Sequence, residues 1–181
     1  KQSNKILDLL KLIAFQVGQE VSLQELARQL GISKNTVESY LDLLSKVFVI
    51  YKVPGFSRNL RKEITKSNRW YFYDNGIRNG IIANFSRLEA RTDVGALWEN
   101  YLASERIKYQ SYTQKSVSNY FWRTYDQQEL DWLEEENGIL RGYEFKWNEN
   151  RKAKIPGAFS KAYSEASFEV VSKANYLDFI M

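Results

Sequence analysis

The chain of 181 residues contains no cysteine and no histidine. Without cysteine there can be no disulfide bond and no thiolate metal site, so we expect a protein of the reducing cytoplasm. Without histidine there can be no histidine acid–base catalysis, and most zinc sites are excluded. Any bound metal ion must be held by carboxylates and carbonyls, which are ligands that suit Mg²⁺, Mn²⁺ or Ca²⁺.

Other signals are missing as well. No apolar run approaches the roughly 20 residues of a membrane helix, and there is no signal peptide, so no membrane partner is expected. The sequence has no G-x-x-x-x-G-K-[ST] loop, and by itself it should not hydrolyse ATP. It begins at Lys1 rather than at methionine, and we expect it to be part of a longer protein.

The composition is that of a folded globular protein, with 44% hydrophobic and 27% charged residues. The net charge of +4 is distributed unevenly. Residues 1–80 hold 13 Lys and Arg against 7 Asp and Glu, whereas residues 81–181 hold 13 against 15. The first part can therefore attract a polyanion such as nucleic acid, and any chemistry on nucleic acid in the second part needs a local site.

The first part of the chain shows apolar residues at helical spacing, with capping signals between the segments. Ser22 and Ser33 precede such runs as helix caps, and Gly18 and Gly31 end the runs before them. The order helix, helix, tight turn, helix and two-stranded hairpin predicts a winged helix-turn-helix for residues 1–75. The expected elements are helices at 3–17, 23–30 and 34–46 and strands at 47–53 and 70–73.

Residues 76–181 predict a second domain with helices on a central mixed sheet, that is, an α/β or α+β fold. The boundary between the domains is expected within residues 75–92. Gly138 lies between two β-rich runs and predicts an antiparallel hairpin. The expected elements are helices at 74–83, 93–107 and 156–162 and strands at 120–125, 130–134, 139–147 and 168–171.

The predicted hairpin carries a constellation of charged residues. A period of two places Glu144 and Lys146 on one face of their strand. On the preceding strand the same period places Asp131 on the face opposite Leu130 and Trp132. If the two strands pair, Asp131 comes near Glu144 and Lys146.

Glu99 is expected on the long helix among apolar residues, an unfavourable place for a carboxylate that binds nothing. Carboxylates grouped in this way can hold a divalent ion, which neutralises a phosphate and lowers the pKa of a bound water. A nearby lysine can orient that water or stabilise negative charge. Such a set would serve phosphodiester hydrolysis.

The four residues together resemble the signature of the restriction-endonuclease-like, PD-(D/E)xK nucleases. The helix glutamate is similar to that of the archaeal Holliday-junction-resolvase branch. The resemblance implies that Glu99, Asp131 and Glu144 are catalytic residues that hold Mg²⁺ or Mn²⁺, and that Lys146 assists the nucleophile. The residue before Asp131 is Leu130 rather than the proline of the idealised motif.

Longer stretches, among them SLQELARQLGISKNTVESYLDLL, DVGALWENYLASE and FWRTYDQQELDWL, resemble the C-terminal region of a bacterial and archaeal AAA+ ATPase family. Its members look like an ATPase module followed by a winged helix and a nuclease-like domain. The resemblance implies an upstream ATPase module as partner and as the place of ATP binding. We expect nucleic acid, with DNA as the favoured form, as the other partner, and a homo-oligomer is allowed. The alternative is a non-catalytic scaffold with a degenerate nuclease fold.

Two groups of residues are candidates for nucleic-acid contact. Lys34, Asn35 and Ser39 would face bases or phosphates if the third helix lies in a major groove, although Glu38 opposes this. A second group is basic and would contact phosphates in the predicted wing: Arg58, Arg61, Lys62, Lys66 and Arg69. The alternative is that both groups pack against the ATPase module.

Simpler interpretations exist for several charged and aromatic residues. Glu144 and Lys146 can form a salt bridge on a solvated sheet. Glu129 and residues 134–136 are expected to form a solvated face or a hairpin edge rather than a second metal site. Arg123 is left open between phosphate binding and a structural ion pair. Four tryptophans are expected to serve packing rather than base stacking: Trp98, Trp122, Trp132 and Trp147.

Overall fold

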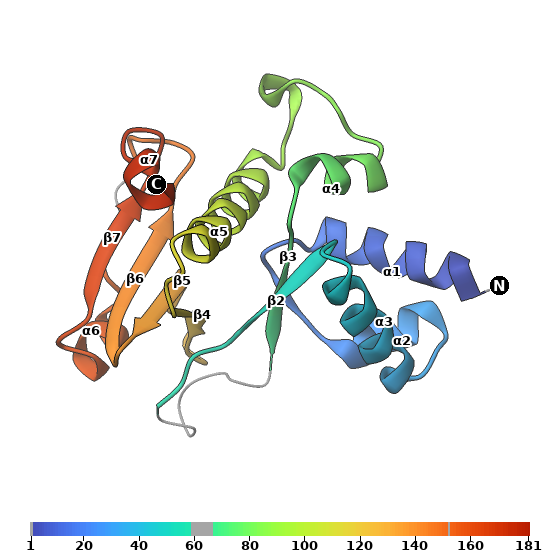
Figure 1. Ribbon diagram of the computed structural model, residues 1–181, viewed down its shortest axis with the longest axis horizontal. Helices are drawn as coiled ribbons and strands as arrows, with labels where there is room; N and C mark the ends of the chain where they lie inside the picture. The colour runs from blue at the N-terminus through green and yellow to red at the C-terminus, as the bar shows by residue number, and fades with distance from the viewer. Residues whose placement is uncertain (1, 59–66, 152) are drawn as a thin grey trace.

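The computed structural model describes residues 2–58, 67–151 and 153–181 as a mixed α+β protein with two β-sheets (Figure 1). The first sheet is antiparallel throughout, in the order β1-β3-β2. Its strands are β1 (Glu20–Val21), β2 (Ile50–Pro54) and β3 (Asn68–Phe72), and the helices before β2 are α1 (Gln2–Phe15), α2 (Leu23–Leu30) and α3 (Lys34–Lys46).

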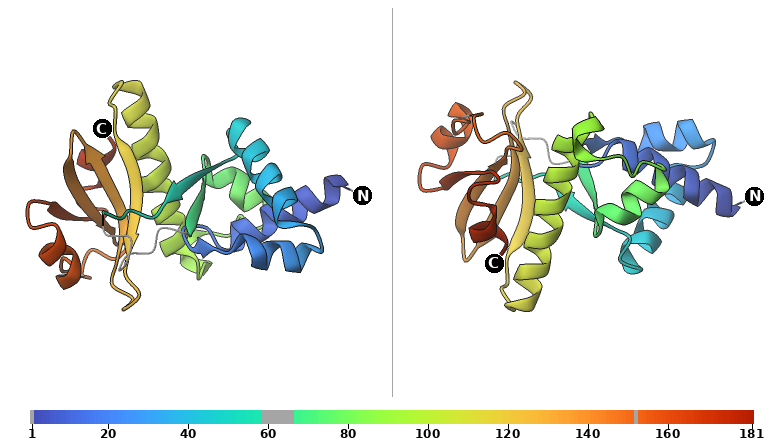
Figure 2. Two further views of the ribbon diagram at one scale, coloured as in Figure 1. Left: turned by 90° about the horizontal axis from the view of Figure 1, so that it is seen from below. Right: turned by 90° about the horizontal axis from the view of Figure 1, so that it is seen from above.

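The second sheet has the order β4-β5-β6-β7 and is mixed, because β6 and β7 pair in parallel while the other pairs are antiparallel. The helix α5 lies between the two sheets (Figure 2). This confirms a mixed sheet combined with helices. The strands are β4 (Ser118–Arg123), β5 (Glu129–Glu136), β6 (Ile139–Phe145) and β7 (Ser167–Val171). The helices are α4 (Asn75–Ile81), the 3₁₀ turn η1 (Leu88–Ala90), α5 (Val94–Tyr112), α6 (Gly157–Ala162) and α7 (Tyr176–Ile180).

Capping residues set the bounds of α2 and the start of α3, as predicted. The Ser22 hydroxyl accepts a hydrogen bond from the Glu25 N–H, and the Ser33 hydroxyl accepts one from the Thr36 N–H. Gly31 ends α2 with φ of 63°, a left-handed conformation that glycine adopts at little cost. The predicted helix at 34–46 coincides with α3.

Two predicted strands are shorter than expected. Residues 47–49 form a turn with Phe48 at φ 58°, so β2 begins only at Ile50. The strand β6 ends at Phe145, which leaves Lys146 just beyond it. The Lys146 N–H still donates to the Val171 carbonyl at 2.9 Å, so its backbone remains held against β7.

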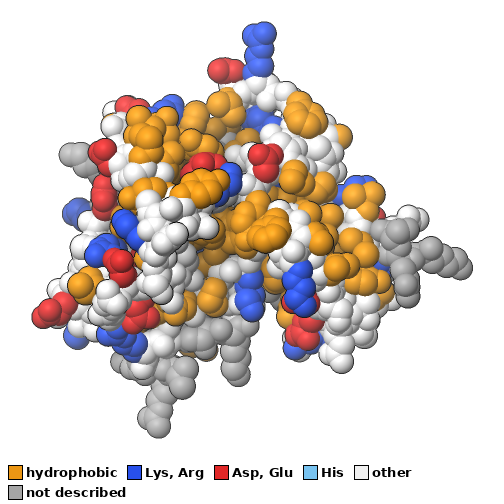
Figure 3. Space-filling model, in the orientation of Figure 1, with side chains coloured by type: hydrophobic (Ala, Val, Ile, Leu, Met, Phe, Trp, Pro, Cys, Tyr) orange, Lys and Arg blue, Asp and Glu red, His pale blue; other side chains and the backbone are white. Residues whose placement is uncertain are grey.

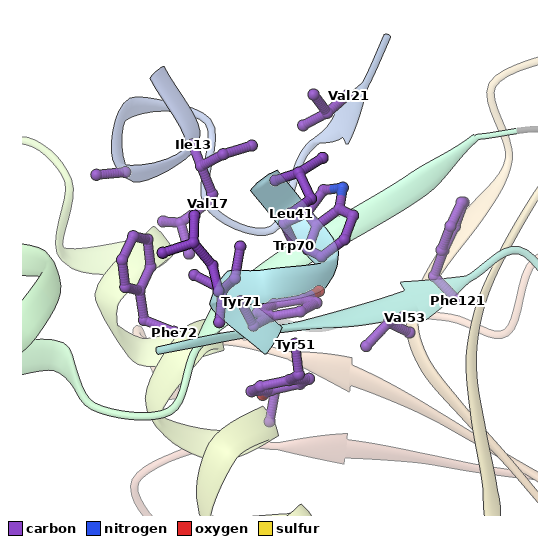
Figure 4. Packing of buried hydrophobic residues seen from close by; sticks show 14 of the residues in the cluster. Ile13, Val17, Val21, Leu41, Tyr51, Val53, Trp70, Tyr71, Phe72 and Phe121 are labelled. Carbon is purple, nitrogen blue, oxygen red and sulfur yellow. The ribbon is translucent and has the colours of Figure 1, made fainter. Parts of the chain in front are cut away.

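One hydrophobic core spans both sheets. Tyr71 on β3 and Trp132 on β5 belong to the same buried cluster and meet edge to face, with ring centroids 6.2 Å apart. Beyond β2, the Phe56 N–H donates to the Phe121 carbonyl of β4 at 2.8 Å. Figure 4 shows Phe121 beyond the end of β2, next to Val53. Hydrophobic side chains gather on the surface where the two parts of the molecule meet (Figure 3).

A β-bulge in β5 changes the faces that period two predicts. The pairing shifts register, since Tyr120 lies opposite Leu133 whereas Trp122 lies opposite Leu130. One extra residue on β5 is therefore accommodated at the positions of Asp131 and Trp132. Leu130 consequently joins a cluster with Phe159 of α6, while Trp132 joins the core that includes Tyr71. The prediction that Leu130 and Trp132 share a face was wrong for this reason.

The start of α5 is held by an ionic group rather than by a side-chain cap. The Asp93 carboxylate makes no capping hydrogen bond, but it accepts from Arg91 at 2.8 Å and from Arg78 at 2.5 Å. Arg78 also donates to the Ala14 carbonyl, which connects α5 to the end of α1. These two arginines, Arg91 first, hold the pKa of Asp93 well below its usual range. No helix in the described ranges is both long and apolar enough to cross a membrane.

We predict that Asp93→Asn lowers the free energy of unfolding at pH 7 by about 2 kcal/mol, because the buried Arg78 loses its charged partner. Since the folded-state pKa is depressed, this contribution is present above the unfolded pKa of about 3.9 and is lost as the pH falls below it. Urea denaturation at pH 7 and pH 3 should therefore show a smaller difference from wild type at pH 3. Asp42→Asn, which breaks the exposed pair with Lys46, is the control and should change little at either pH.

Candidate functional site

Glu99 points from α5 toward the first sheet. Its Oε1 accepts a hydrogen bond from the Tyr71 hydroxyl of β3 at 2.7 Å. The carboxylate also lies against Gly18, whose φ is 73°, and a Cβ built at Gly18 would be only 2.6 Å from Glu99 Oε1. The side chain is 20% exposed. The carboxylate that sequence analysis placed among apolar residues thus finds its partners on β3 and at the end of α1.

Asp131 lies in the bulge of β5, and its side chain is 14% exposed. Its Oδ2 accepts from the Phe145 N–H at 2.8 Å. The ladder between β5 and β6 runs only as far as Trp132 and Tyr143, so the Asp131 carboxylate bonds to a backbone donor beyond that ladder. This contact brings Asp131 to the end of β6, where Glu144 and Lys146 lie.

Glu144 and Lys146 form an ion pair, with 2.5 Å between Lys146 Nζ and Glu144 Oε1. Both side chains are partly buried. Burial opposes the charge of Lys146, but the hydrogen bond and the charge of Glu144 raise its pKa above the usual value. The salt-bridge interpretation of this pair is therefore correct as far as the contact is concerned, although the pair lies beside Asp131 rather than alone on a solvated face.

The three carboxylates influence one another. Burial, and then the charge of Asp131, raise the pKa of Glu99 to about 8. Burial, and then the charge of Glu144, raise the pKa of Asp131 to about 6. All four residues predicted for the catalytic set thus belong to one electrostatically connected cluster, contributed by α5, β5 and the end of β6.

Arg69, predicted as a phosphate contact on the surface, lies inside this cluster. Its side chain on β3 is 5% exposed. Its Nη2 donates to Glu129 Oε2 at 2.9 Å, and its Nη1 is 3.7 Å from Glu99 Oε1 and 3.9 Å from Asp131 Oδ1. The guanidinium carbon lies 4.6 Å from the centre of the Phe121 ring, within the range of a cation–π contact.

A second arginine completes the junction between the sheets. Arg123 of β4 forms an ion pair with Glu20 of β1, and Ser67 also bonds to Glu20. Of the two interpretations left open for Arg123, the structure shows the ion pair. The junction contains five carboxylates (Glu20, Glu99, Glu129, Asp131 and Glu144) and three cationic groups (Arg69, Arg123 and Lys146).

The predicted metal ligands do not fit a divalent ion in this arrangement. Over the ranges that the structure describes, no group of three acidic side chains is placed to hold a metal ion. Mg²⁺ and Mn²⁺ need carboxylate oxygens in direct contact. The Arg69 guanidinium instead approaches both Glu99 and Asp131. The structure therefore brings acidic residues of α5 and β5 together around the Arg69 guanidinium rather than around a space for a metal ion.

The predicted nucleic-acid contacts on α3 lie on its exposed surface. Lys34 forms an i, i+4 ion pair with Glu38, and both side chains are about half exposed. Asn35 is exposed, and the Ser39 hydroxyl donates back to the Asn35 carbonyl at 2.9 Å. The positive charge on this face is therefore offset by a neighbouring carboxylate, which weakens its attraction for phosphate.

The predicted wing cations separate into two groups. Arg58 pairs with Glu135 of β5 at 2.7 Å and approaches the Gly138 carbonyl at 3.3 Å, so its guanidinium contacts the second sheet. Arg61, Lys62 and Lys66 lie outside the described residues.

Glu134 was expected on a solvated face or a hairpin edge, and the expectation that it is solvated was wrong. Glu134 is 1% exposed and accepts two hydrogen bonds from Arg106 of α5, at 2.6 and 2.7 Å. Gln110 and the Trp132 indole also donate to it. A buried carboxylate with four donors is a structural ion pair that fastens α5 to β5. The nearby basic and amide residues of α5 were the only sequence signal for it.

Two protein-family models match the chain. Residues 1–89 match a model described as "Domain of unknown function (DUF8612)", and residues 94–177 match one described as "Domain of unknown function (DUF4143)". The two matched ranges are separated by residues 90–93. They fall on either side of the start of α5.

Relatives are found in mycobacteria. Uncharacterized proteins of Mycobacterium bovis and Mycobacterium tuberculosis are each 29% identical to the chain over 137 residues. The aligned region covers 75% of this chain but only 30% of each relative. No solved structure matches the chain.

We predict that Gly18→Ala lowers the free energy of unfolding by about 2 kcal/mol, through its left-handed φ and through displacement of the Glu99 carboxylate from Tyr71. Gly31→Ala is the matched control, because Gly31 has a similar φ but no atom within 4 Å of the added Cβ. It should cost about 1 kcal/mol.

The difference between the two glycine variants should disappear when both are measured by urea denaturation in a Glu99→Ala background. Glu99 would then no longer oppose a side chain at position 18. An equal excess cost of Gly18→Ala in both backgrounds would show that Glu99 is not pressed against this turn.

Proposed function

We propose that this chain is the C-terminal region of an AAA+ ATPase that binds nucleic acid through a winged helix and carries a nuclease-type site for phosphodiester hydrolysis. The observation that carries the proposal is the meeting of Glu99, Asp131, Glu144 and Lys146 in one cluster. These residues are far apart in sequence and come from separate elements. They resemble the four-residue signature of PD-(D/E)xK nucleases in both type and order.

The chain's own residues supply two functions for such a reaction. Lys146 carries a positive charge beside Glu144 and can stabilise negative charge that develops on a phosphate oxygen. Asp131, with a pKa raised to about 6, can accept a proton from an attacking water near neutral pH. No step is assigned to a divalent ion, because Arg69 approaches the carboxylates that would hold it.

Nucleic acid is proposed to meet the chain at α3 and at the basic segment that follows β2. Lys34, Asn35 and Ser39 are accessible on α3. Arg61, Lys62 and Lys66 supply three further positive charges close together in sequence. Arg58 and Arg69 are excluded from this proposed surface, since both are engaged with carboxylates of the second sheet. DNA is the expected ligand.

The proposal includes an ATPase module because long stretches of the sequence resemble the C-terminal region of an AAA+ ATPase family. The aligned region spans 30% of the length of the mycobacterial relatives, which leaves room in those proteins for a separate module. ATP binding and hydrolysis are assigned to such a module and not to the chain itself. A cytoplasmic location is part of the same proposal.

A second candidate function is a non-catalytic scaffold, and the position of Arg69 favours it. The guanidinium connects β3 to Glu99 on α5 and to Glu129 and Asp131 on β5. In this role the carboxylates hold the two sheets together instead of acting on a substrate. The two candidates differ in what Lys146 does, because its contact with Glu144 does not link the sheets.

We predict slow, Lys146-dependent cleavage of supercoiled, linear or branched DNA in an excess of Mn²⁺. Lys146→Ala should reduce the rate by at least about a hundredfold, since it removes the charge that stabilises the developing anion. Lys173→Ala is the matched control, because Lys173 packs over the ring of Trp147, the residue that follows Lys146. This variant should cleave DNA like wild type. Cleavage that survives Lys146→Ala would contradict the assignment, and no cleavage of any substrate would favour the scaffold.

We predict that simultaneous replacement of Arg61, Lys62 and Lys66 by alanine weakens DNA binding and makes it less dependent on salt. Each lost phosphate contact should reduce the slope of log affinity against log salt by about 0.9. Fluorescence anisotropy with a labelled duplex at several salt concentrations measures this slope. Lys11→Ala, Lys108→Ala and Lys161→Ala together remove the same charge elsewhere and should leave the slope nearly unchanged.

A further inference from the structure

Arg69 is fixed in the carboxylate cluster from several sides. The hydrogen bond to Glu129 and the face of the Phe121 ring hold the guanidinium, and the backbone of Arg69 is in the central strand of the first sheet. Its Nη1 then faces Glu99 and Asp131 at distances within 4 Å. A buried charge is tolerated only when it is paired, and the ion pairs of Arg69 among the described residues are with carboxylates of α5 and β5.

The same contacts leave one donor of Arg69 without a partner. Among the described residues, no acceptor bonds to the buried Arg69 Nε. Leaving a buried donor unsatisfied is unfavourable, so the position of the guanidinium is set by its contacts with the carboxylates, among them the hydrogen bond to Glu129, and not by any bond from Nε. Arg69 thus offsets the negative charge of the cluster, although its own buried Nε donor is left without an acceptor among the described residues.

A divalent ion and this guanidinium cannot both occupy the cluster. Metal ions of the Mg²⁺ type need carboxylate oxygens at roughly 2.0–2.2 Å. Arg69 Nη1 already approaches oxygens of Glu99 and Asp131, which are two of the carboxylates that would have to bind the ion. The two cations would also repel each other strongly at such short range in a partly buried site. Binding of one therefore requires departure of the other.

We infer that Arg69 is the resident cation of the Glu99–Asp131 cluster and that a divalent metal ion binds these carboxylates only after the guanidinium has left. The inference deepens the proposed function and rests on the nuclease-type role of the cluster. It makes β3 of the first sheet an inhibitory element of a site that lies in the second part of the chain. It also accounts for the presence of a complete four-residue set that does not form a metal site in the structure.

The test is Mn²⁺ binding, measured by electron paramagnetic resonance of the free ion during titration of the 181-residue chain. Arg69→Gln should bind Mn²⁺ at least about tenfold more tightly than wild type, because it removes a neighbouring positive charge. Arg69→Lys keeps the charge and should bind as weakly as wild type. Arg123→Gln removes the other arginine of the junction without uncovering Glu99 and Asp131, and should also bind weakly.

Adding Asp131→Asn to Arg69→Gln should abolish the gain and thereby locate the ion. Thermal unfolding followed by circular dichroism provides a second readout, because a bound ion should raise the midpoint of Arg69→Gln but not that of wild type. Equal Mn²⁺ affinity of folded Arg69→Gln and wild type would overturn the inference.

A measurement on wild type keeps the inference testable if Arg69→Gln does not fold. Wild type and Asp131→Asn should then bind Mn²⁺ equally weakly. Tight binding by wild type that Asp131→Asn removes would show that Arg69 does not exclude the ion. Because metal binding is measured without a substrate, a gain in Arg69→Gln together with an absence of DNA cleavage would support the inference and contradict the hydrolytic function.

Discussion

The guanidinium of Arg69 is buried at the junction of the two sheets, where it faces Glu99, Glu129 and Asp131. The relation between the first sheet and the rest of the molecule depends on this contact. Without the guanidinium, three carboxylates would meet in a partly buried space, with Arg123 near Glu129 and Lys146 beside Glu144 as the remaining described cations. Like charges at short range in such a place repel strongly. Without the carboxylates, Arg69 would be an uncompensated charge in the core.

The surrounding packing is organised around the same contact. Tyr71, two residues after Arg69 on β3, donates to Glu99 and packs against Trp132. The close approach of α5 to the end of α1 requires a residue without a Cβ at Gly18. A network of this kind rigidifies an interface because each member restricts the others, and it makes the interface sensitive to the loss of any one charge. Burial is the first cause of the raised pKa values of Glu99 and Asp131, and the negative charge of the neighbouring carboxylates raises them further.

The bulge in β5 explains how a carboxylate comes to lie beside core aromatic residues. In a regular strand Leu130 and Trp132 would share a face, and Asp131 would point the other way. The extra residue directs Leu130 toward α6 and Trp132 toward the core that contains Tyr71, while Asp131 reaches the end of β6. Bulges often occur beside functional sites because they turn one side chain without disturbing the rest of a sheet.

Local signals in the sequence predicted most of the helices and strands, but not the short elements β1, η1 and α7. Ser22 and Gly31 determine the bounds of α2, and Ser33 determines the start of α3, because caps act within a single turn. Strand periodicity and the spacing of Glu144 and Lys146 were likewise local. Tertiary structure alone decided that Arg69 enters the cluster, that Gly18 touches Glu99 and that Glu134 is buried by Arg106. Each of these contacts joins residues at least 28 positions apart. The strength of the charge interactions among them depends on burial, which no local pattern of residues encodes.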